Sequence, residues 1–97
     1  MAILQYYDLL YQQKSSAVVA LNRAVVISEL NGPIEGIEAV QSISNIGSLK
    51  NYYLLPDILG DMYKKAGDIK QANEYFTKAV LLTSNEAEKK LLKGKMI

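Results

Sequence analysis

Residues 59–79 read LGDMYKKAGDIKQANEYFTKA, and this stretch decides the fold of the chain. Apolar residues recur in it at steps of three and four, the spacing of an amphipathic helix, on both sides of Gly67. Gly67 permits the left-handed backbone of a tight turn. Gly60 and Ala72 are small, so the two helix backbones can approach closely where they cross. The stretch therefore predicts a helical hairpin.

The same periodicity continues along the rest of the chain, without the alternation that is typical of a strand. The expected helices cover residues 3–13, 17–30, 34–43, 52–65, 69–83 and 85–94. At the break between the second and third of these, Asn31 or Gly32 can take the left-handed position that ends a helix, and Pro33 can begin the next one. Residues 44–48 are the least regular stretch and are expected to form a loop.

Two sequence signals mark where the last helices begin. Asp68 can cap the helix over 69–83 with its carboxylate. Asn85, followed three residues later by Glu88, resembles a capping box for the final helix. Pro56 is tolerable in the first turn of the helix over 52–65, because an N–H at that point would have no partner within the helix.

The composition excludes several classes of function. The 97 residues are 49% apolar and 22% charged, which suits a folded domain. Neither Cys nor His occurs, so disulfides, thiolate or imidazole metal sites and histidine-based catalytic triads are excluded. A net charge of +1 gives no overall positive field for a nucleic acid backbone. The longest apolar run, residues 17–21, is far too short to span a membrane, and the first residues resemble no export signal, so a cytoplasmic protein is expected.

The hairpin over 52–84 resembles a tetratricopeptide (TPR) unit. The helix breaks at Asn31-Gly32 and Ala66-Gly67 lie 35 residues apart, close to the 34-residue period of that repeat. The residues at the spacings of the TPR signature are Leu59, Gly60, Tyr63, Gly67, Ala72, Phe76 and Ala79. Pro56 and Ser84 depart from it, standing where the signature has an aromatic residue and a proline.

The resemblance implies an all-α fold of about six helices, with antiparallel hairpins stacked as a TPR-like right-handed solenoid. Within a single domain over 1–97, we expect a degenerate first hairpin region over 3–47, a TPR unit over 52–84 and a capping helix over 85–96. Tyr63 and Phe76 would fill the volume between neighbouring helix pairs.

A narrower resemblance covers most of the chain. Its segments are ILQYYDLL at 3–10, SAVVALNRAV at 16–25, Asn31-Gly32-Pro33, Tyr52-Tyr53, Leu59 and NEAEK at 85–89. In this order they look like the helical C-terminal extension of a subgroup of extracytoplasmic-function (ECF) sigma factors. The most specific part is VALNRAV at 19–25 with Gly32-Pro33 downstream. The resemblance implies a fragment of a transcription initiation factor, whose polymerase-binding and promoter-reading domains would lie upstream.

In stacked TPR-like hairpins, the first helix of each pair lines a concave groove that binds a protein segment. The outward polar residues of the two corresponding helices here are Asn22, Arg23, Glu29, Asp57, Asp61 and Lys64, and they are the predicted partner-binding residues. The partner expected from the resemblance is a protein: the upstream sigma domains, the RNA polymerase core or a signalling protein. DNA would be contacted only through the absent upstream domains, and no membrane, cofactor or metal is expected.

Each of these residues also has a structural interpretation. Asn22 can satisfy backbone groups at a helix crossing, and Arg23 can pair with an acid such as Asp8. Asp57 and Asp61 have the i, i+4 spacing of a metal or acid–base pair, but no third ligand or histidine accompanies them, and a surface ion pair of Asp61 with Lys64 or Lys65 is simpler. We therefore expect no enzymatic activity.

Lysines gather near the end of the chain. Residues 50–97 carry nine Lys/Arg against six Asp/Glu, and residues 1–49 carry two against four. We interpret Lys89, Lys90, Lys93 and Lys95 as the solvated outer face of a terminal helix. Two hypotheses remain: a regulatory interaction domain of an ECF-type sigma factor, or a free-standing TPR-like adaptor that binds a peptide.

Overall fold

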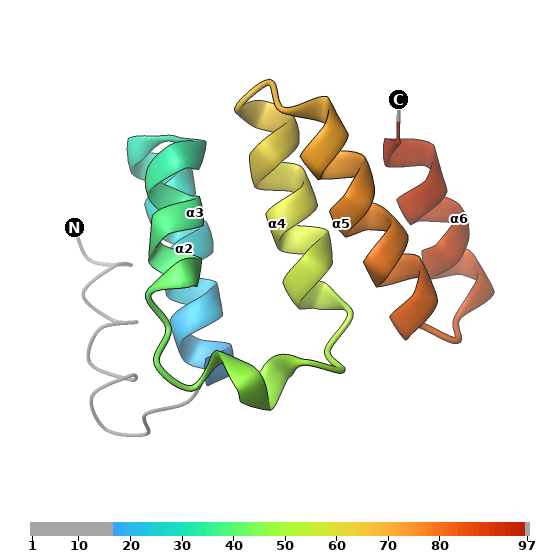
Figure 1. The fold of residues 1–97 in the computed structure, drawn as a ribbon, viewed down its shortest axis with the longest axis horizontal. Coiled ribbons are helices and arrows are strands. Elements are labelled where there is room, and N and C mark those ends of the chain that lie inside the picture. Colours follow the sequence, from blue (N-terminus) through green and yellow to red (C-terminus); the bar gives the residue numbers. More distant parts are fainter. Residues whose placement is uncertain (1–16, 97) are drawn as a thin grey trace. The chain divides into compact units, whose positions relative to one another are not determined.

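The computed structural model describes residues 17–96, and these are helical throughout apart from turns (Figure 1). The elements are α2 (Ala17–Asn31), α3 (Pro33–Gln41), the 3₁₀ helix η1 (Ile46–Leu49), α4 (Leu54–Lys65), α5 (Ile69–Leu82) and α6 (Glu86–Lys95). The prediction of an all-α fold is confirmed. Five α-helices lie within the described residues, against about six predicted, and the expected helix over 3–13 falls outside them.

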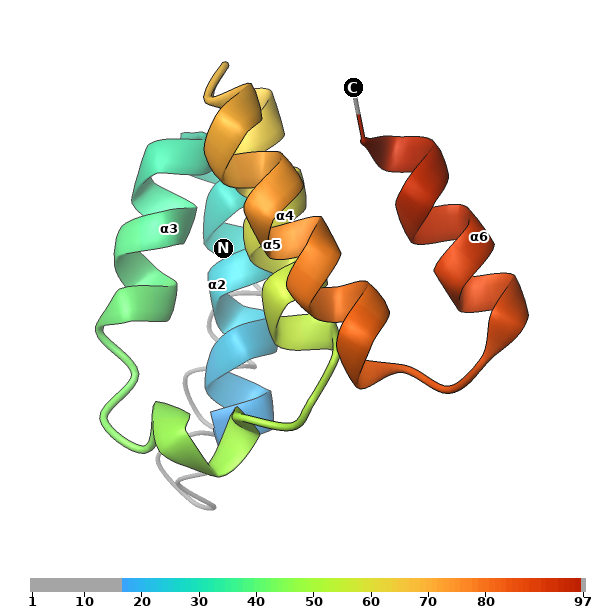
Figure 2. The same cartoon turned by 45° about the vertical axis from the view of Figure 1, so that its right-hand side comes forward.

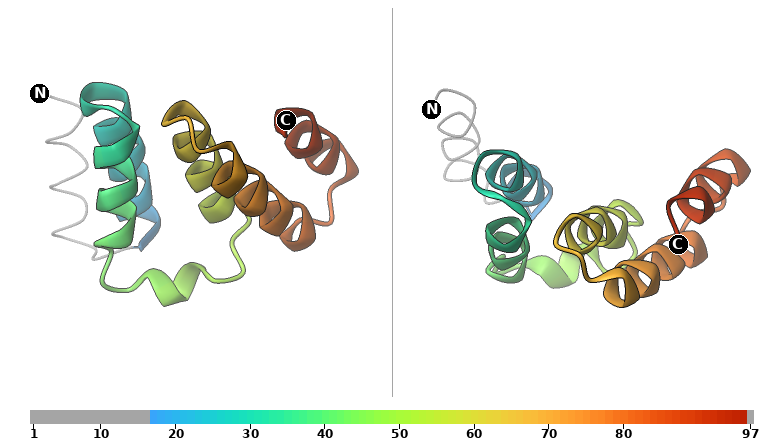
Figure 3. Two further views of the ribbon diagram at one scale, coloured as in Figure 1. Left: turned by 45° about the horizontal axis from the view of Figure 1, so that its top comes forward. Right: turned by 90° about the horizontal axis from the view of Figure 1, so that it is seen from above.

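The chain divides into two compact units, one up to Lys50 and the other from Asn51 onward. In the first unit, α2 packs along α3 (Figure 3). Gly32 takes φ +104° between them, as the sequence predicts for Asn31 or Gly32, and Pro33 opens α3. Buried Leu49 holds η1 beside α2, so the stretch expected to be a plain loop over 44–48 contains a 3₁₀ turn.

Close helix contact in the first unit depends on a residue that the sequence pattern did not single out. A Cβ built on Gly36 of α3 would lie 2.5 Å from the Cβ of Ser28 in α2. That distance is shorter than two such carbons tolerate, so only glycine fits there without movement of a helix. Leu21 and Ala24 of α2 and Val40 of α3 are also buried.

In the second unit, α4 and α5 form the hairpin that the stretch 59–79 predicts (Figure 3). Gly67 takes φ +89° in the turn, and the Asp68 carboxylate accepts a hydrogen bond from the Gln71 N–H at 3.2 Å, so both the turn and the cap are confirmed. A Cβ on Gly60 would lie 2.5 Å from the ring of Phe76, which therefore packs directly on the α4 backbone. Pro56 is the third residue of α4, within its first turn.

The core of the second unit extends from α5 to α6 (Figure 2). Ala72, Phe76 and Ala79 of α5 and Leu92 of α6 are almost fully buried together. Their burial removes apolar surface from water at about 25 cal/mol per Å², which is the main force that holds the last helix to the hairpin.

The start of α6 differs in one detail from the capping box that the sequence predicts. The Asn85 side chain accepts the Glu88 N–H at 3.1 Å, as expected. The Glu88 carboxylate, however, accepts a 2.6 Å hydrogen bond from the Thr83 hydroxyl, and that hydroxyl oxygen accepts the Asn85 N–H at 3.2 Å. Thr83, which is 9% exposed, thus takes the place that Glu88 has in a reciprocal box. Within residues 17–96, no helix is long and apolar enough to cross a membrane.

Candidate functional site

The six predicted partner-binding residues divide between the two units. Asn22, Arg23 and Glu29 lie on α2, where Asn22 and Glu29 are exposed and Arg23 is half-buried. The other three lie on α4 in the second unit. The pairing of Arg23 with Asp8 falls outside the described residues, and a groove shared by α2 and α4 stays a prediction.

The three α4 residues all contact a single residue of α6. The Lys95 ammonium lies 2.8 Å from the Asp57 carboxylate and 3.2 Å from the Asp61 carboxylate. The Lys64 ammonium donates a 2.9 Å hydrogen bond to the Lys95 backbone carbonyl. We call these four residues the α4–α6 charge cluster. Its negative and positive side chains are equal in number, two of each, so the cluster is balanced in charge.

This cluster corrects two sequence-based interpretations. Asp61 forms an ion pair with Lys95 across the two helices, and the Lys64 ammonium donates to the Lys95 carbonyl. Lys95 is a structural cation facing α4, so it does not belong to the solvated outer face that was expected for the terminal lysines. The i, i+4 spacing of Asp57 and Asp61 did matter, because it puts both carboxylates on one face, where a single ammonium reaches both.

Partial burial decides which of these contacts is strongest. The side chain of Asp57 is 16% exposed and that of Asp61 46%, so the pair with Asp57 is better shielded from water. Burial alone would lower the pKa of Lys95, but hydrogen bonding and charge from Asp57, and then from Asp61, outweigh it and raise that pKa above its ordinary value. The ammonium also lies 5.6 Å from the centre of the Phe76 ring, a favourable cation–π distance.

Lys64 contributes differently, by capping the end of α6. The last carbonyl groups of a helix have no partner within it and carry partial negative charge. The Lys64 ammonium donates to one of these groups, the Lys95 carbonyl, and its positive charge interacts favourably with the negative end of the helix dipole. The charge cluster therefore attaches the last turn of α6 to α4 through both its side chain and its backbone.

A small cleft continues from the cluster between α4 and α6. It has a volume of about 100 Å³ and is lined by Tyr53, Asp57, Glu88, Leu91, Leu92 and Lys95. Burial, followed by hydrogen bonding to the Glu88 carboxylate, raises the pKa of the Tyr53 hydroxyl. The cleft is too small for a cofactor but has the size of a single side chain.

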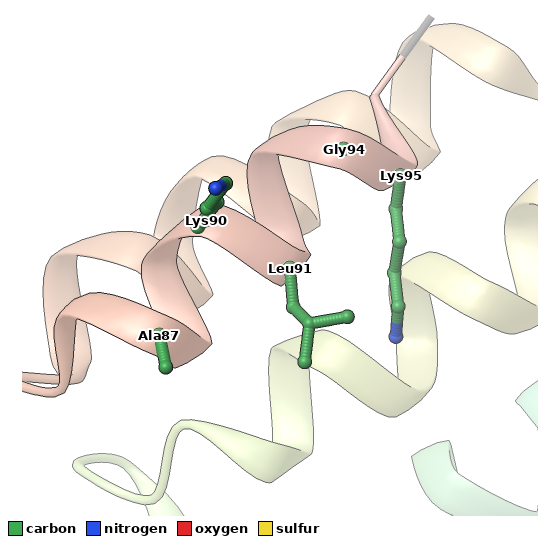
Figure 4. A pocket seen from close by; sticks show the side chains of 5 residues that line it. All are labelled: Ala87, Lys90, Leu91, Gly94 and Lys95. Atoms are coloured by element: carbon green, nitrogen blue, oxygen red, sulfur yellow. The ribbon is translucent and has the colours of Figure 1, made fainter.

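Leu91, one of the residues that line this cleft, is 67% exposed, unlike its buried neighbour Leu92. Figure 4 shows Leu91 and Lys95 extending from the same side of α6, whereas Lys90 extends from the other side. A wider hollow of about 570 Å³ adjoins Leu91 and is lined by Ala87, Lys90, Leu91, Gly94 and Lys95. The sequence analysis did not identify Leu91, although a second leucine beside Leu92 in a lysine-rich helix was the available signal.

The charge cluster and the surface beside it combine paired charges with accessible apolar groups. The carboxylates of Asp57 and Asp61 share a single ammonium, that of Lys95. Around them lie an exposed leucine and a shallow apolar hollow. Interfaces between proteins combine such accessible apolar groups with charged groups at their edge.

Comparisons with known proteins give one similar chain and no family. The chain is 33% identical over 85 residues to an uncharacterized protein of Rhizobium meliloti (strain 1021), a match that covers 84% of this chain. The chain spans 20% of the length of that relative. No family model matches the chain, and no solved structure matches it.

Proposed function

We propose that this chain is a protein-interaction domain of stacked, TPR-like helical hairpins, with no catalytic activity of its own. The observation that carries the proposal is the exposed Leu91 and its apolar hollow next to the α4–α6 charge cluster. A leucine that is two-thirds exposed at the edge of a balanced set of charges is the kind of surface that a protein partner covers.

We further propose that the domain is a regulatory C-terminal part of an ECF-type sigma factor in the cytoplasm. The support is the resemblance of residues 16–33 and 85–89 to that family's helical extension. The Rhizobium meliloti relative adds that a region similar to this one occurs inside a much longer bacterial chain, since the match covers a fifth of it.

Such a domain would act by shifting a conformational equilibrium. A partner that binds the domain in only one arrangement of the parent sigma factor raises the population of that arrangement. A tenfold preference for one arrangement corresponds to about 1.4 kcal/mol, which a few contacts of the kind found around Leu91 can supply. Promoter recognition itself would remain with the upstream domains.

The test is capture of defined partners by the immobilised chain. Purified bacterial RNA polymerase core and the purified polymerase- and promoter-binding domains of an ECF sigma factor are offered separately. Arg23→Glu and Asp61→Lys reverse the charge of one predicted residue in each unit. Glu74→Lys is the matched control, because Glu74 is an exposed acid on α5, outside the charge cluster.

We expect one of the two partners to be retained, capture to fall at least tenfold for Asp61→Lys and Arg23→Glu, and the control to behave as wild type. Retention of neither partner would refute the link to transcription initiation. If a peptide partner unrelated to transcription is bound instead, with the same sensitivity to Asp61→Lys, the chain is a free-standing adaptor.

A further inference from the structure

The last helix of the second unit lies on a surface of α4 and α5 that we call the α6 seat. Its residues are Ala72, Phe76 and Ala79 of α5, which are apolar and buried, and the aspartates Asp57 and Asp61 of α4. Leu92 is the buried residue of α6, and Lys95 reaches both aspartates. These contacts do not involve the connection between α5 and α6. A helix with a leucine and a lysine at the same spacing makes them whichever copy of the chain supplies it.

Three residues, 83–85, connect α5 to α6 and form the bend that returns α6 to the seat of its own chain (Figure 2). Thr83 and Asn85 have extended backbones, with ψ of 142° and 119°. The Thr83 hydroxyl donates to the Glu88 carboxylate and accepts the Asn85 N–H, and the Asn85 side chain accepts the Glu88 N–H. These local hydrogen bonds replace the backbone bonds that a helix running through the same residues would form.

No residue in the connection prevents a helix from running through it. Residues 69–93 include neither glycine nor proline. Ser84 stands where the TPR signature has a proline, and a proline there would block a continuous helix. A separate helix of ten residues, the length of α6, is marginal in water, whereas a helix over residues 69–95 gains from cooperativity. The chain is therefore compatible with both a bent and a straight connection.

We propose that a straight connection lets two copies of the chain exchange α6, so that the α6 of each copy lies in the seat of the other. The exchanged dimer keeps every seat contact, including the ion pairs of Lys95 with Asp57 and Asp61. It differs from two separate chains in the connection, where helical hydrogen bonds replace those of the bend. Exchange therefore needs no new complementary surface. The inference is independent of the proposed function, since it concerns the chain alone.

Two changes in the connection shift the balance in opposite directions and leave the seat intact. Ser84→Pro blocks a straight helix and suits the bend, because Thr83 already has the extended backbone that a residue before proline adopts. The double variant Ser84→Ala, Asn85→Ala removes the cap of α6 and favours a helix through the connection. Sedimentation velocity over a range of concentrations measures the monomer and the dimer of the wild-type chain and of both variants.

Cross-linking identifies the surface that joins the two copies. The chain has no cysteine, and the Thr77 hydroxyl of α5 lies 4.0 Å from the Met96 sulfur at the end of α6. A copy with Thr77→Cys is mixed at high concentration with a copy carrying Met96→Cys, and the mixture is diluted at once and oxidised. The matched control replaces the second copy with Lys90→Cys, because Lys90 is exposed on the side of α6 away from Lys95 (Figure 4).

We expect the dimer fraction of the wild-type chain to rise with concentration. The dissociation constant of the dimer should be at least tenfold lower for the double-alanine variant and at least tenfold higher for Ser84→Pro. The mixed disulfide between Thr77→Cys and Met96→Cys copies should form in the dimer, with at least tenfold less product from the control pair.

The proposal is overturned if the wild-type chain and the double-alanine variant both stay monomeric, or if Ser84→Pro dimerises like wild type. A dimer that gives equal cross-linking for the two cysteine pairs is joined by another surface and also overturns it. Far-UV circular dichroism verifies that each variant is folded. If Ser84→Pro does not fold, the double-alanine variant and the cross-linking still decide the question.

Discussion

In each of the two helical hairpins, a glycine on one helix makes room for a side chain of the other helix, but the glycine lies on the first helix in one hairpin and on the second in the other. In α4–α5, the glycine is on the first helix, and Gly60 accepts the ring of Phe76 from the second. In α2–α3, the glycine is on the second helix, and Gly36 accepts Ser28 from the first. Each hairpin also turns through a glycine with positive φ, Gly67 or Gly32. The TPR signature has its glycine on the first helix of the hairpin. It therefore identifies the α4–α5 hairpin and misses the α2–α3 hairpin, although both need a glycine where the helices meet.

The largest effect is expected from filling the contact of the second hairpin. Gly60→Leu would place carbon atoms where the Phe76 ring lies, since even a Cβ would come within 2.5 Å of it. Because Phe76 is fully buried and cannot turn aside, α4 and α5 must separate, at a cost of about 3 kcal/mol or more. Urea denaturation measures the free energy of unfolding. A loss below about 1 kcal/mol would contradict this packing. The packing would be supported if Phe76→Leu recovered part of the stability that Gly60→Ala loses.

The corresponding change in the first hairpin should cost less. Gly36→Ala brings a Cβ to 2.5 Å from the Ser28 Cβ and 3.0 Å from its hydroxyl, but serine is small and only half-buried. We expect a loss of about 1–2 kcal/mol, measured by the same denaturation. Ser28→Gly in the Gly36→Ala background removes the clashing atoms and should recover part of it. A larger loss here than for Gly60→Leu would reverse the comparison between the hairpins.

The hairpins also differ in what packs against them. Within residues 17–96, the α4–α5 hairpin carries a further α-helix, α6, which is joined to α4 by ion pairs. Lys95→Met keeps an unbranched apolar side chain but removes the ammonium that joins α6 to Asp57 and Asp61. We expect a loss of about 1 kcal/mol, since one ion pair is well shielded and the other is half exposed. Lys93→Met, which removes an exposed lysine that forms no ion pair among residues 17–96, is the control and should change stability little.

The same variant should alter the response to alkaline pH. The pKa of Lys95 is raised above 10.5 in the folded chain, so its stabilisation is fully present below pH 10.5 and is lost as the pH rises through the folded value. Tyr53 and Tyr63 have raised pKa values too, mainly through burial, and lose stabilisation in the same direction above pH 10.0. The difference in unfolding free energy between wild type and Lys95→Met should therefore shrink above pH 10.5, while both proteins become less stable. A constant difference would mean that Lys95 is not stabilised as an ammonium.

The sequence was sufficient for the hairpin of the second unit and insufficient for the site. Gly67 and Asp68 act through neighbours in the chain, so their roles follow from local chemistry. The contacts of Lys95 with Asp57 and Asp61 join residues 38 and 34 positions apart, and they depend on how α6 is rotated about its axis. Four lysines lie in that helix, and nothing local distinguishes the one that faces α4.

The rotation of α6 about its axis is set by which of its leucines is buried, and the sequence pattern does not show which one that is. Leu91 and Leu92 are adjacent and chemically identical, yet Leu92 enters the core and Leu91 faces outward. The Thr83–Glu88 hydrogen bond and the Asn85 cap set the start of the helix, and the core contact of Leu92 then sets which lysine meets the aspartates. If Leu91 took the core position in place of Leu92, the sequence would be the same, but the helix would be rotated by about 100° about its axis.

The smallest effect is expected at Gly94, where an added Cβ would meet nothing within 4 Å. Gly94→Ala should stabilise the chain by about 0.5–1 kcal/mol, because alanine favours the helix and its methyl group enters open space. This is the opposite sign to Gly60→Leu and Gly36→Ala, so the three glycines together separate those that admit a neighbour from the one that does not. Urea denaturation measures the change, and a loss of stability on Gly94→Ala would contradict the open surroundings of Gly94.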